Sequence, residues 1–159
     1  MYTAKEIAEY VIGYYSMEKQ SYISNLKLQK VMYFLQANHL VSTGRKLFDE
    51  KIEAVSFGPM VKSVYKEYMI YGSANIPYHE NTYKLNILKN DQKGMNELLD
   101  ELEPYSSNFL LEIIFHQTPW EKAYYNHGRL YLDKNYGVRE IKEITDESLI
   151  EFFKEKNYE

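Results

Sequence analysis

The segment from Ser24 to Gly44 constrains the fold of this 159-residue chain more than any other. Its apolar residues recur at the helical period and cover a wide face: Leu28, Val31, Met32, Phe34 and Leu35. Ser24 is suited to accept a hydrogen bond from the first turn of a helix, and the cluster 42–44 (Ser-Thr-Gly) is typical of a helix end. A helix with so wide an apolar surface is expected to lie at the centre of the core.

Capping and periodicity signals predict further helices on both sides of this segment. They are expected after Thr3, from Pro59 to Gly72, through Met95 to Pro104, after Ser106 or Ser107, from Thr118, and from Asp146. Thr3 and Thr118 each have a glutamate three residues later, which is the spacing of a capping box. Gly58-Pro59 is interpreted as a sharp turn into a helix, because proline suits the first helical turn.

Strand signals are fewer. The alternation in 83–87 (YKLNI) predicts a strand, and two β-leaning stretches in 129–144 predict a hairpin around 133–137. Residues 52–57 are too few to distinguish a strand from the end of the loop at 45–51. Since no repeat or linker divides residues 1–159, we expect a mainly α (α+β) fold: a single compact helical domain with a small β-hairpin or minor sheet.

Composition excludes several classes of protein. The formal net charge is −4, which gives no broad attraction to nucleic acid or to anionic lipid. The chain has no cysteine, so disulfides, thiolate nucleophiles and cysteine-based zinc sites are ruled out. No apolar stretch approaches the length of a membrane span. These features predict a cytoplasmic, unexported protein with no membrane partner.

The sequence offers no recognisable catalytic centre. Its histidines, at 39, 79, 116 and 127, form no metal-binding helical pair. Acidic runs such as 100–103 are typical of a solvated helix face, and no glycine-rich phosphate loop is present. We therefore expect no catalytic residue, no cofactor and no metal.

Four short phrases occur in an order that resembles a known family. They are 26–34 (LKLQKVMYF), 46–49 (KLFD), 57–65 (FGPMVKSVY) with Tyr71-Gly72 after it, and 116–123 (HQTPWEKA). Across residues 3–153 the chain is similar to the SocA-like, or Panacea-domain, family of bacterial and phage antitoxins, which includes phage-associated GepA-like proteins. The resemblance implies a protein that neutralises a cognate protein toxin, encoded beside it, by direct binding. A variant of this role is an adaptor that passes the toxin to a protease.

The same resemblance supplies the expected partner-binding residues: Leu28, Gln29, Lys30, Tyr33, Gly58, Pro59, Tyr65, His116, Pro119 and Trp120. Several of them are expected to line one central surface, with Gln29, Lys30 and Tyr33 exposed and with Leu28 and Trp120 favoured as core. On this view, truncating Tyr33 or Tyr65 weakens neutralisation without lowering the thermal midpoint. The stoichiometry is left open.

Two other functions are considered. A DNA-binding transcriptional autoregulator would use a patch of lysines and tyrosines: Lys27, Lys30, Lys62, Lys66, Tyr33 and Tyr65. A hydrolase would depend on the imidazole of His116. The acidic net charge argues against nucleic acid as a partner.

Overall fold

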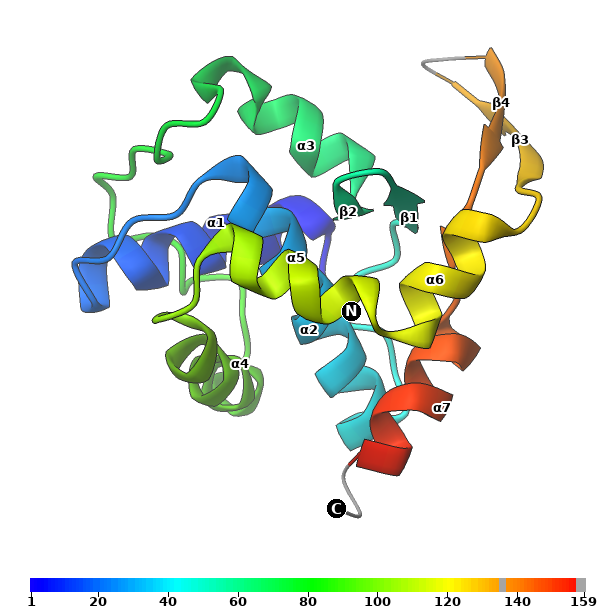
Figure 1. The fold of residues 1–159 in the computed structure, drawn as a ribbon. Helices are drawn as coiled ribbons and strands as arrows, with labels where there is room; N and C mark the ends of the chain where they lie inside the picture. Colours follow the sequence, from blue (N-terminus) through cyan, green and yellow to red (C-terminus); the bar gives the residue numbers. More distant parts are fainter. Residues whose placement is uncertain (135–136, 157–159) are drawn as a thin grey trace.

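The computed structural model describes residues 1–134 and 137–156. This part of the chain contains seven α-helices and five β-strands, and the longest helix, α2, lies among the others (Figure 1). The helices are α1 (Ala4–Gly13), α2 (Asn25–Thr43), α3 (Lys62–Tyr68), α4 (Lys89–Leu102), α5 (Ser107–Phe115), α6 (Thr118–Tyr125) and α7 (Asp146–Lys156). The strands are β1 (Ile52–Val55), β2 (Gly58–Met60), β3 (Arg129–Asp133), β4 (Gly137–Ile141) and β5 (Glu143–Ile144). The expected mainly helical α+β fold is confirmed.

Helix α2 occupies the centre, as its sequence predicts. The hydroxyl of Ser24 accepts a hydrogen bond from the backbone N–H of Lys27, and Gly44 ends the helix with a φ of 74°. Helices α1, α3, α4, α5 and α7 and strand β2 all contact α2. Its buried side chains include polar ones, at Asn25, Gln29, Lys30 and Gln36, as well as apolar ones. Such groups are stable inside a core only when they find partners there.

The amino-terminal helix begins with the predicted capping box. The hydroxyl of Thr3 accepts from the backbone N–H of Glu6, while the Glu6 carboxylate accepts from the N–H of Thr3. α1 continues into a π-helical turn, Tyr14–Glu18. At the junction, Gly13 lies directly against the ring of Tyr83, whose Cγ would be 2.4 Å from a Cβ at this position. The close contact explains why a residue without a side chain stands there.

The prediction that Gly58-Pro59 starts a helix is wrong. Both residues lie in β2, an edge strand of the antiparallel sheet β2-β1-β5, where Pro59 pairs with Ala54. A proline is tolerated on an edge strand because its missing N–H need not serve a neighbour, and Gly58 adopts a φ of 113° that favours glycine. The helix α3 starts only at Lys62 and is followed by a 3₁₀ turn, Met69–Tyr71, which ends at Gly72 as expected.

The strand predicted at residues 83–87 is also absent, and this segment forms successive turns. The backbone N–H of Leu85 donates to Thr82, and that of Ile87 donates to Lys84. Tyr83 and Ile87 are buried while Leu85 is exposed. The apolar residues four apart therefore share one side of the turns, and the alternation is coincidental.

The helices expected on the carboxyl side are present, although α4 begins at Lys89, before the expected stripe, and the cap of α6 differs. α4 carries the predicted apolar stripe, and the hydroxyl of Ser106 caps α5. For α6, the N-cap is Gln117 rather than Thr118, and no side chain caps the helix, so the predicted capping box is wrong. Pro119 lies in the first turn, as predicted.

The predicted hairpin is formed by β3 and β4, with Leu132 opposite Val138. Of the turn expected at 133–137, residues 135 and 136 lie outside the described residues. Figure 1 shows the hairpin standing out from the helical body, with α7 following it. No helix in the described ranges is long and apolar enough to cross a membrane.

Candidate partner-binding surface

The amide of Gln29 joins α2 to the start of α3. Its Oε1 accepts a hydrogen bond of 2.8 Å from the backbone N–H of Val61, and its Nε2 donates to the side chain of Asn25. The Asn25 side chain in turn donates to the carbonyl of Tyr65. Both polar atoms of the Gln29 amide and both of the Asn25 amide are therefore hydrogen-bonded, and these bonds fix the position of α3 relative to α2.

The hydroxyl of Tyr33 joins α2 to the break between α5 and α6. It donates a hydrogen bond of 2.7 Å to Oε1 of Gln117, the residue that precedes α6. Tyr33 is completely buried, with its ring packed edge to face against Phe34 and Phe153. Burial raises the pKa of this hydroxyl above its usual value, which favours the protonated form that donates the hydrogen bond.

The amide of Gln36 holds the loop that follows α2. Its Oε1 accepts hydrogen bonds from the backbone N–H groups of Leu47, at 2.8 Å, and Phe48, at 3.2 Å. Its Nε2 donates to the carbonyl of Phe48 at 2.8 Å. Sequence reasoning did not single out Gln36, although it belongs to the same helix face as the two residues above.

Positions 29, 33 and 36 are spaced four and three apart, so their side chains lie on one face of α2. Each binds a different one of the three other phrases that identified the sequence pattern: 57–65, 116–123 and 46–49. The four phrases therefore meet at a buried polar network. They meet in the interior and not on a surface.

Lys30 lies on the same helix and is also buried. Its Nζ donates to the carbonyl of Leu26 at 3.1 Å, and burial lowers its pKa to about 8. Its stem passes close to Gly58: a Cβ at that glycine would lie 3.8 Å from Cε of Lys30 and 3.0 Å from a methyl of Leu111. Gly58 is thus favoured both by its φ and by the space available.

Trp120 closes the network on the side of α6. Its indole N–H donates to the carbonyl of Val55 in β1 at 3.1 Å. Its ring stacks on Tyr124 and packs against Phe115. The interpretation of Trp120 as a core residue is confirmed.

The expected exposure of Gln29, Lys30 and Tyr33 is wrong, since all three are buried. The residues of the expected set that are buried are Leu28, Gln29, Lys30, Tyr33, Gly58, Pro59, Pro119 and Trp120. Of the other two, Tyr65 is half-buried and His116 is exposed. A direct contact with a partner in the folded state is open to these two alone, and the rest are in a position to support the surface from beneath.

The structure does not assemble the basic patch considered for nucleic acid. Lys30 is buried, and Nζ of Lys27 donates to the backbone carbonyl of Glu103. For the hydrolase alternative, His116 caps the end of α5, and within the described residues no carboxylate or hydroxyl hydrogen-bonds to its imidazole. The described residues also contain no group of three acidic or histidine side chains placed to hold a metal ion.

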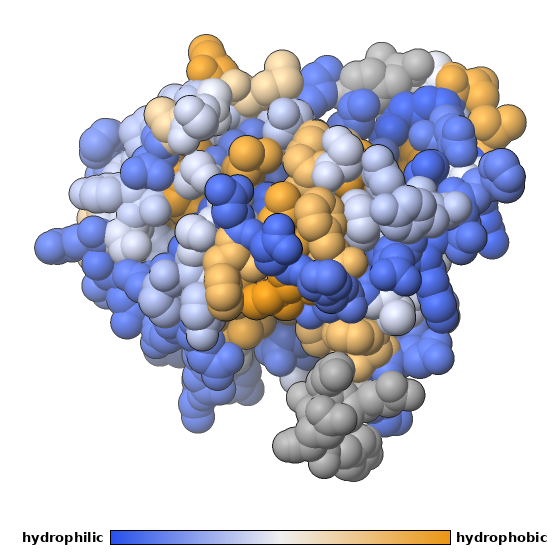
Figure 2. All heavy atoms as spheres, viewed as in Figure 1, coloured by the Kyte–Doolittle hydropathy of each residue, from blue (hydrophilic) through white to orange (hydrophobic). Residues whose placement is uncertain are grey.

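Apolar side chains are exposed in two places relevant to a partner. On α5, Phe109 and Ile113 face outward, and Phe109 stacks on Tyr105. Figure 2 shows apolar surface at the centre of this view, over the region of α5, and again at the projecting hairpin. The hairpin residues are Leu130, Leu132 and Val138, with exposed fractions of 75%, 84% and 68%.

The opposite face of the hairpin is polar and is attached to the body. Arg139 forms a bidentate ion pair with Glu53 of β1, with both nitrogen-to-oxygen distances 2.8 Å. Glu53 is buried, and the hydroxyl of Tyr131 donates to Glu143 at 2.9 Å. Sequence reasoning did not identify the Glu53–Arg139 pair, because nothing local links two residues 86 positions apart.

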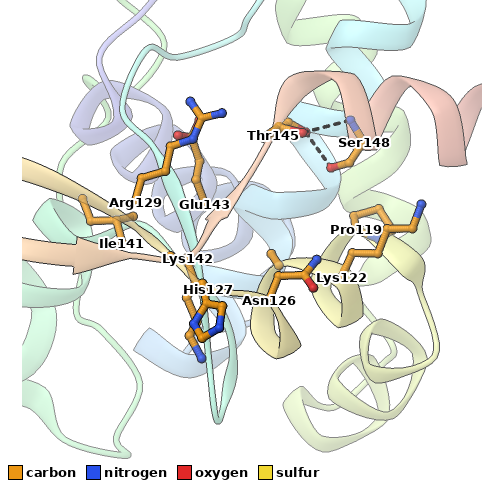
Figure 3. A pocket seen from close by; sticks show the side chains of 12 residues that line it. Pro119, Lys122, Asn126, His127, Arg129, Ile141, Lys142, Glu143, Thr145 and Ser148 are labelled. Carbon is orange, nitrogen blue, oxygen red and sulfur yellow. Dashed lines mark hydrogen bonds between the residues drawn. The ribbon is translucent and has the colours of Figure 1, made fainter.

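A cleft of about 340 Å³ lies at the base of the hairpin, between α6 and the start of α7 (Figure 3). Its basic lining residues are Lys122, His127, Arg129 and Lys142, and its acidic one is Glu143. Nζ of Lys142 donates to the carbonyl of Tyr124 at 2.8 Å. Thr145 and Ser148, which hydrogen-bond to each other at the start of α7, complete the wall shown in Figure 3.

A comparison with protein families matches residues 28–158 to the family described as antitoxin SocA-like, Panacea domain. No curated protein and no solved structure matches the chain. The matched region begins within α2 and contains β1 to β5 and helices α3 to α7, and it includes Gln29, Tyr33 and Gln36, the hairpin and the cleft.

Proposed function

The chain belongs to the antitoxin SocA-like, Panacea domain family, and on that basis we propose that it neutralises a cognate protein toxin by binding it directly. The match over residues 28–158 carries this proposal. The mechanism is occlusion: the toxin's working surface is covered, and no substrate is converted. A stable complex of this kind buries on the order of 1,600 Å² in total.

The exposed apolar side chains support a role in binding. Leu130 and Leu132 lie almost fully in water on the hairpin, and Phe109 and Ile113 are partly exposed on α5. Contiguous exposed apolar surface is typical of a protein interaction site. Interfaces also depend on a few aromatic or apolar anchors surrounded by a polar rim, and Phe109 of α5, stacked on Tyr105 just before the helix, fits this description.

We assign two roles to the residues taken from the family pattern. Tyr65 and His116 contact the toxin directly, because they are the accessible members of the set. The buried members, such as Gln29 and Tyr33, hold α3 and the α5–α6 break in the positions from which the surface is built. Loss of a buried member therefore weakens neutralisation through the fold, whereas loss of Tyr65 or His116 weakens it without unfolding the protein.

The test is co-expression with the product of the adjacent reading frame, which is expected to be the toxin. Growth arrest caused by that product is relieved by the wild-type chain, and the two purified proteins form a complex of fixed stoichiometry. An immunoblot of the toxin during rescue separates two mechanisms: occlusion leaves the toxin level unchanged, and delivery to a protease lowers it. Failure of the wild-type chain to relieve the arrest would refute the proposal.

The rival functions predict different outcomes in simple assays. A DNA-binding autoregulator retards its own promoter fragment, with an affinity that falls steeply as salt rises. A hydrolase acts on a panel of esters and phosphoesters and loses this activity in His116→Ala. We expect neither result with the purified chain.

A further inference from the structure

We infer that the β3–β4 hairpin docks the toxin. An extended segment of the toxin, in which apolar residues alternate with acidic ones, adds as a strand to the free edge of β3. This inference rests on the proposed function. It goes beyond it by naming the surface and the chemistry of the segment that binds there.

The first observation is the orientation of the hairpin. Leu132 pairs with Val138, and Leu130 lies two residues along the same strand, so the three side chains share one face. An antiparallel sheet in a soluble protein normally turns its apolar face to the core and its polar face to water. Here the apolar face points to water, which leaves it available to a partner.

Specific polar contacts fix this orientation. The ion pair between Arg139 and Glu53 and the hydrogen bond from Tyr131 to Glu143 both attach the polar face to the body. Nζ of Lys51 also lies 4.7 Å from the centre of the Tyr131 ring. Turning the apolar face inward would break the pair and leave the buried Glu53 without its guanidinium, which is costly.

The second observation is the open edge. Among the described residues, β3 pairs with β4 alone. Within the same described ranges β4 likewise pairs with β3 alone, but it continues through Lys142 directly into β5 of the other sheet, whereas β3 follows α6 through residues 126–128 (Figure 1). An edge strand with exposed leucines is a ready template for strand addition, in which backbone hydrogen bonds give affinity and alternate side chains give specificity.

The third observation is charge. The cleft at the base of the hairpin is lined by Lys122, Arg129 and Lys142, although the chain as a whole carries −4. The acidic lining residue, Glu143, already accepts a hydrogen bond from the hydroxyl of Tyr131. The local excess of positive charge favours carboxylates on the partner.

The alternation of side chains along β3 predicts the residue pattern of the added segment. In an added strand, residues beside Leu130 and Leu132 face the apolar side, and the residues between them face the side of Arg129 and Tyr131. Apolar residues therefore suit the first set of positions, and aspartate or glutamate suits the second. The segment is thus an alternating apolar and acidic strand.

The apolar part is tested with a matched pair of double variants. Leu130→Thr with Leu132→Thr removes the leucines and keeps side chains that favour a strand. Leu85→Thr with Leu88→Thr removes leucines of similar exposure, 76% and 70%, from the turn before α4. With the purified product of the adjacent reading frame as the probe, we expect the hairpin variant to raise Kd by about ten- to thirtyfold and to lose growth rescue. The control variant is expected to keep the wild-type Kd and the wild-type growth rescue.

The charged part is tested by reversing one side chain. Arg129→Glu is expected to slow association and to reduce its dependence on sodium chloride, because the cation of Arg129 attracts the acidic residues of the segment. Lys93→Glu, an exposed charge reversal on α4, is the control. Hydrogen exchange of the complex is expected to slow at the amides of β3 and not at those of α4, where the control residue Lys93 lies.

The outcomes separate the inference from the proposed function. If the wild-type chain rescues growth and the hairpin double variant rescues equally well, the inference is wrong and the function stands. If the wild-type chain itself fails to rescue, both are wrong. If sedimentation shows that the same double variant converts a dimer of the chain into a monomer without affecting toxin binding, the face belongs to a second copy and the inference is overturned.

Discussion

Replacing Tyr33 by phenylalanine tests the buried network most directly. The substitution removes one hydroxyl and keeps the ring that packs against Phe34 and Phe153. The lost hydrogen bond is short, at 2.7 Å, and its acceptor is Oε1 of Gln117, a side chain that is also buried. The variant therefore creates an unsatisfied buried acceptor without creating a large cavity.

An unsatisfied buried acceptor costs about 1–3 kcal/mol, and we expect about 2 kcal/mol for Tyr33→Phe. For a chain of this length, each kcal/mol lowers Tm by roughly 2–4 °C, so the expected fall is about 4–8 °C. Thermal and urea unfolding followed by circular dichroism measure both quantities. Tyr125→Phe is the matched control, because Tyr125 is exposed and its change is expected to stay within about 0.5 kcal/mol.

A double-mutant cycle with Gln117→Leu separates the hydrogen bond from other effects of the substitution. Removing both partners leaves no unsatisfied group, so the double variant should lose less stability than the sum of the single losses. We expect a coupling energy of about 1–2 kcal/mol between Tyr33 and Gln117. Strictly additive losses, or a Tyr33→Phe variant as stable as the wild type, would refute the assignment of this bond as the link between α2 and the α5–α6 break.

Three further substitutions probe other parts of the structure by urea unfolding. Gly13→Ala forces a Cβ into the ring of Tyr83 and should lower the free energy of unfolding by about 1–3 kcal/mol. Gly94→Ala meets open space within α4 and should raise it by about 0.5–1 kcal/mol. Equal effects would contradict the packing at Gly13. Arg139→Leu should cost about 2–4 kcal/mol because it leaves the buried Glu53 unpaired, and adding Glu53→Leu should restore most of the loss; no recovery would count against the pair. Lys30→Met should stabilise by about 2 kcal/mol at pH 7, because the pKa of Lys30 is lowered to about 8 by burial. The folded wild type binds fewer protons than the unfolded chain between about pH 8 and 10.5, so its stability rises with pH there and the advantage of the variant should shrink; a pH-independent difference would exclude a buried ammonium.

Helix starts and ends were predictable because their signals are local. Thr3, Ser24 and Ser106 each cap the helix that they were expected to cap, and Gly44 and Gly72 end theirs. A cap involves a side chain and a backbone group only three residues away, so the sequence contains the whole interaction. The central place of α2 followed from its wide apolar face for the same reason.

Two elements were mispredicted because contacts outside the local pattern decide them. The pattern at 83–87 alternates like a strand, but Tyr83 packs against Gly13 and Ile87 joins the same core, which holds the segment in turns. Gly58-Pro59 has the composition of a helix start, yet its pairing with β1 makes it a strand. In both cases the local pattern was compatible with two structures, and packing selects one: Tyr83 packs against Gly13, seventy residues earlier, and Gly58-Pro59 pairs with the neighbouring strand β1.

The candidate site was harder to predict, because polar residues on a helix normally face water. Gln29, Lys30 and Tyr33 therefore suggested a surface, and only the positions of Val61 and Gln117 show that their partners are internal. On the hairpin the alternation of residues was visible in the sequence. Which face turns outward was not, because it depends on an ion pair with a strand 86 residues away.

The position of the four phrases has a consequence for recognition. Gln29, Tyr33 and Gln36 bind the other phrases inside the protein, so these buried residues specify the scaffold. Of the expected partner-binding set, only Tyr65 and His116 are accessible. Under the proposed function a toxin contacts only exposed residues, and Leu130, Leu132 and Val138 form a strongly exposed apolar face. Exposed residues away from special features change stability by only about 0.5 kcal/mol when substituted. Under the proposed function, substitutions at this face are therefore expected to change toxin recognition and to leave the buried network intact.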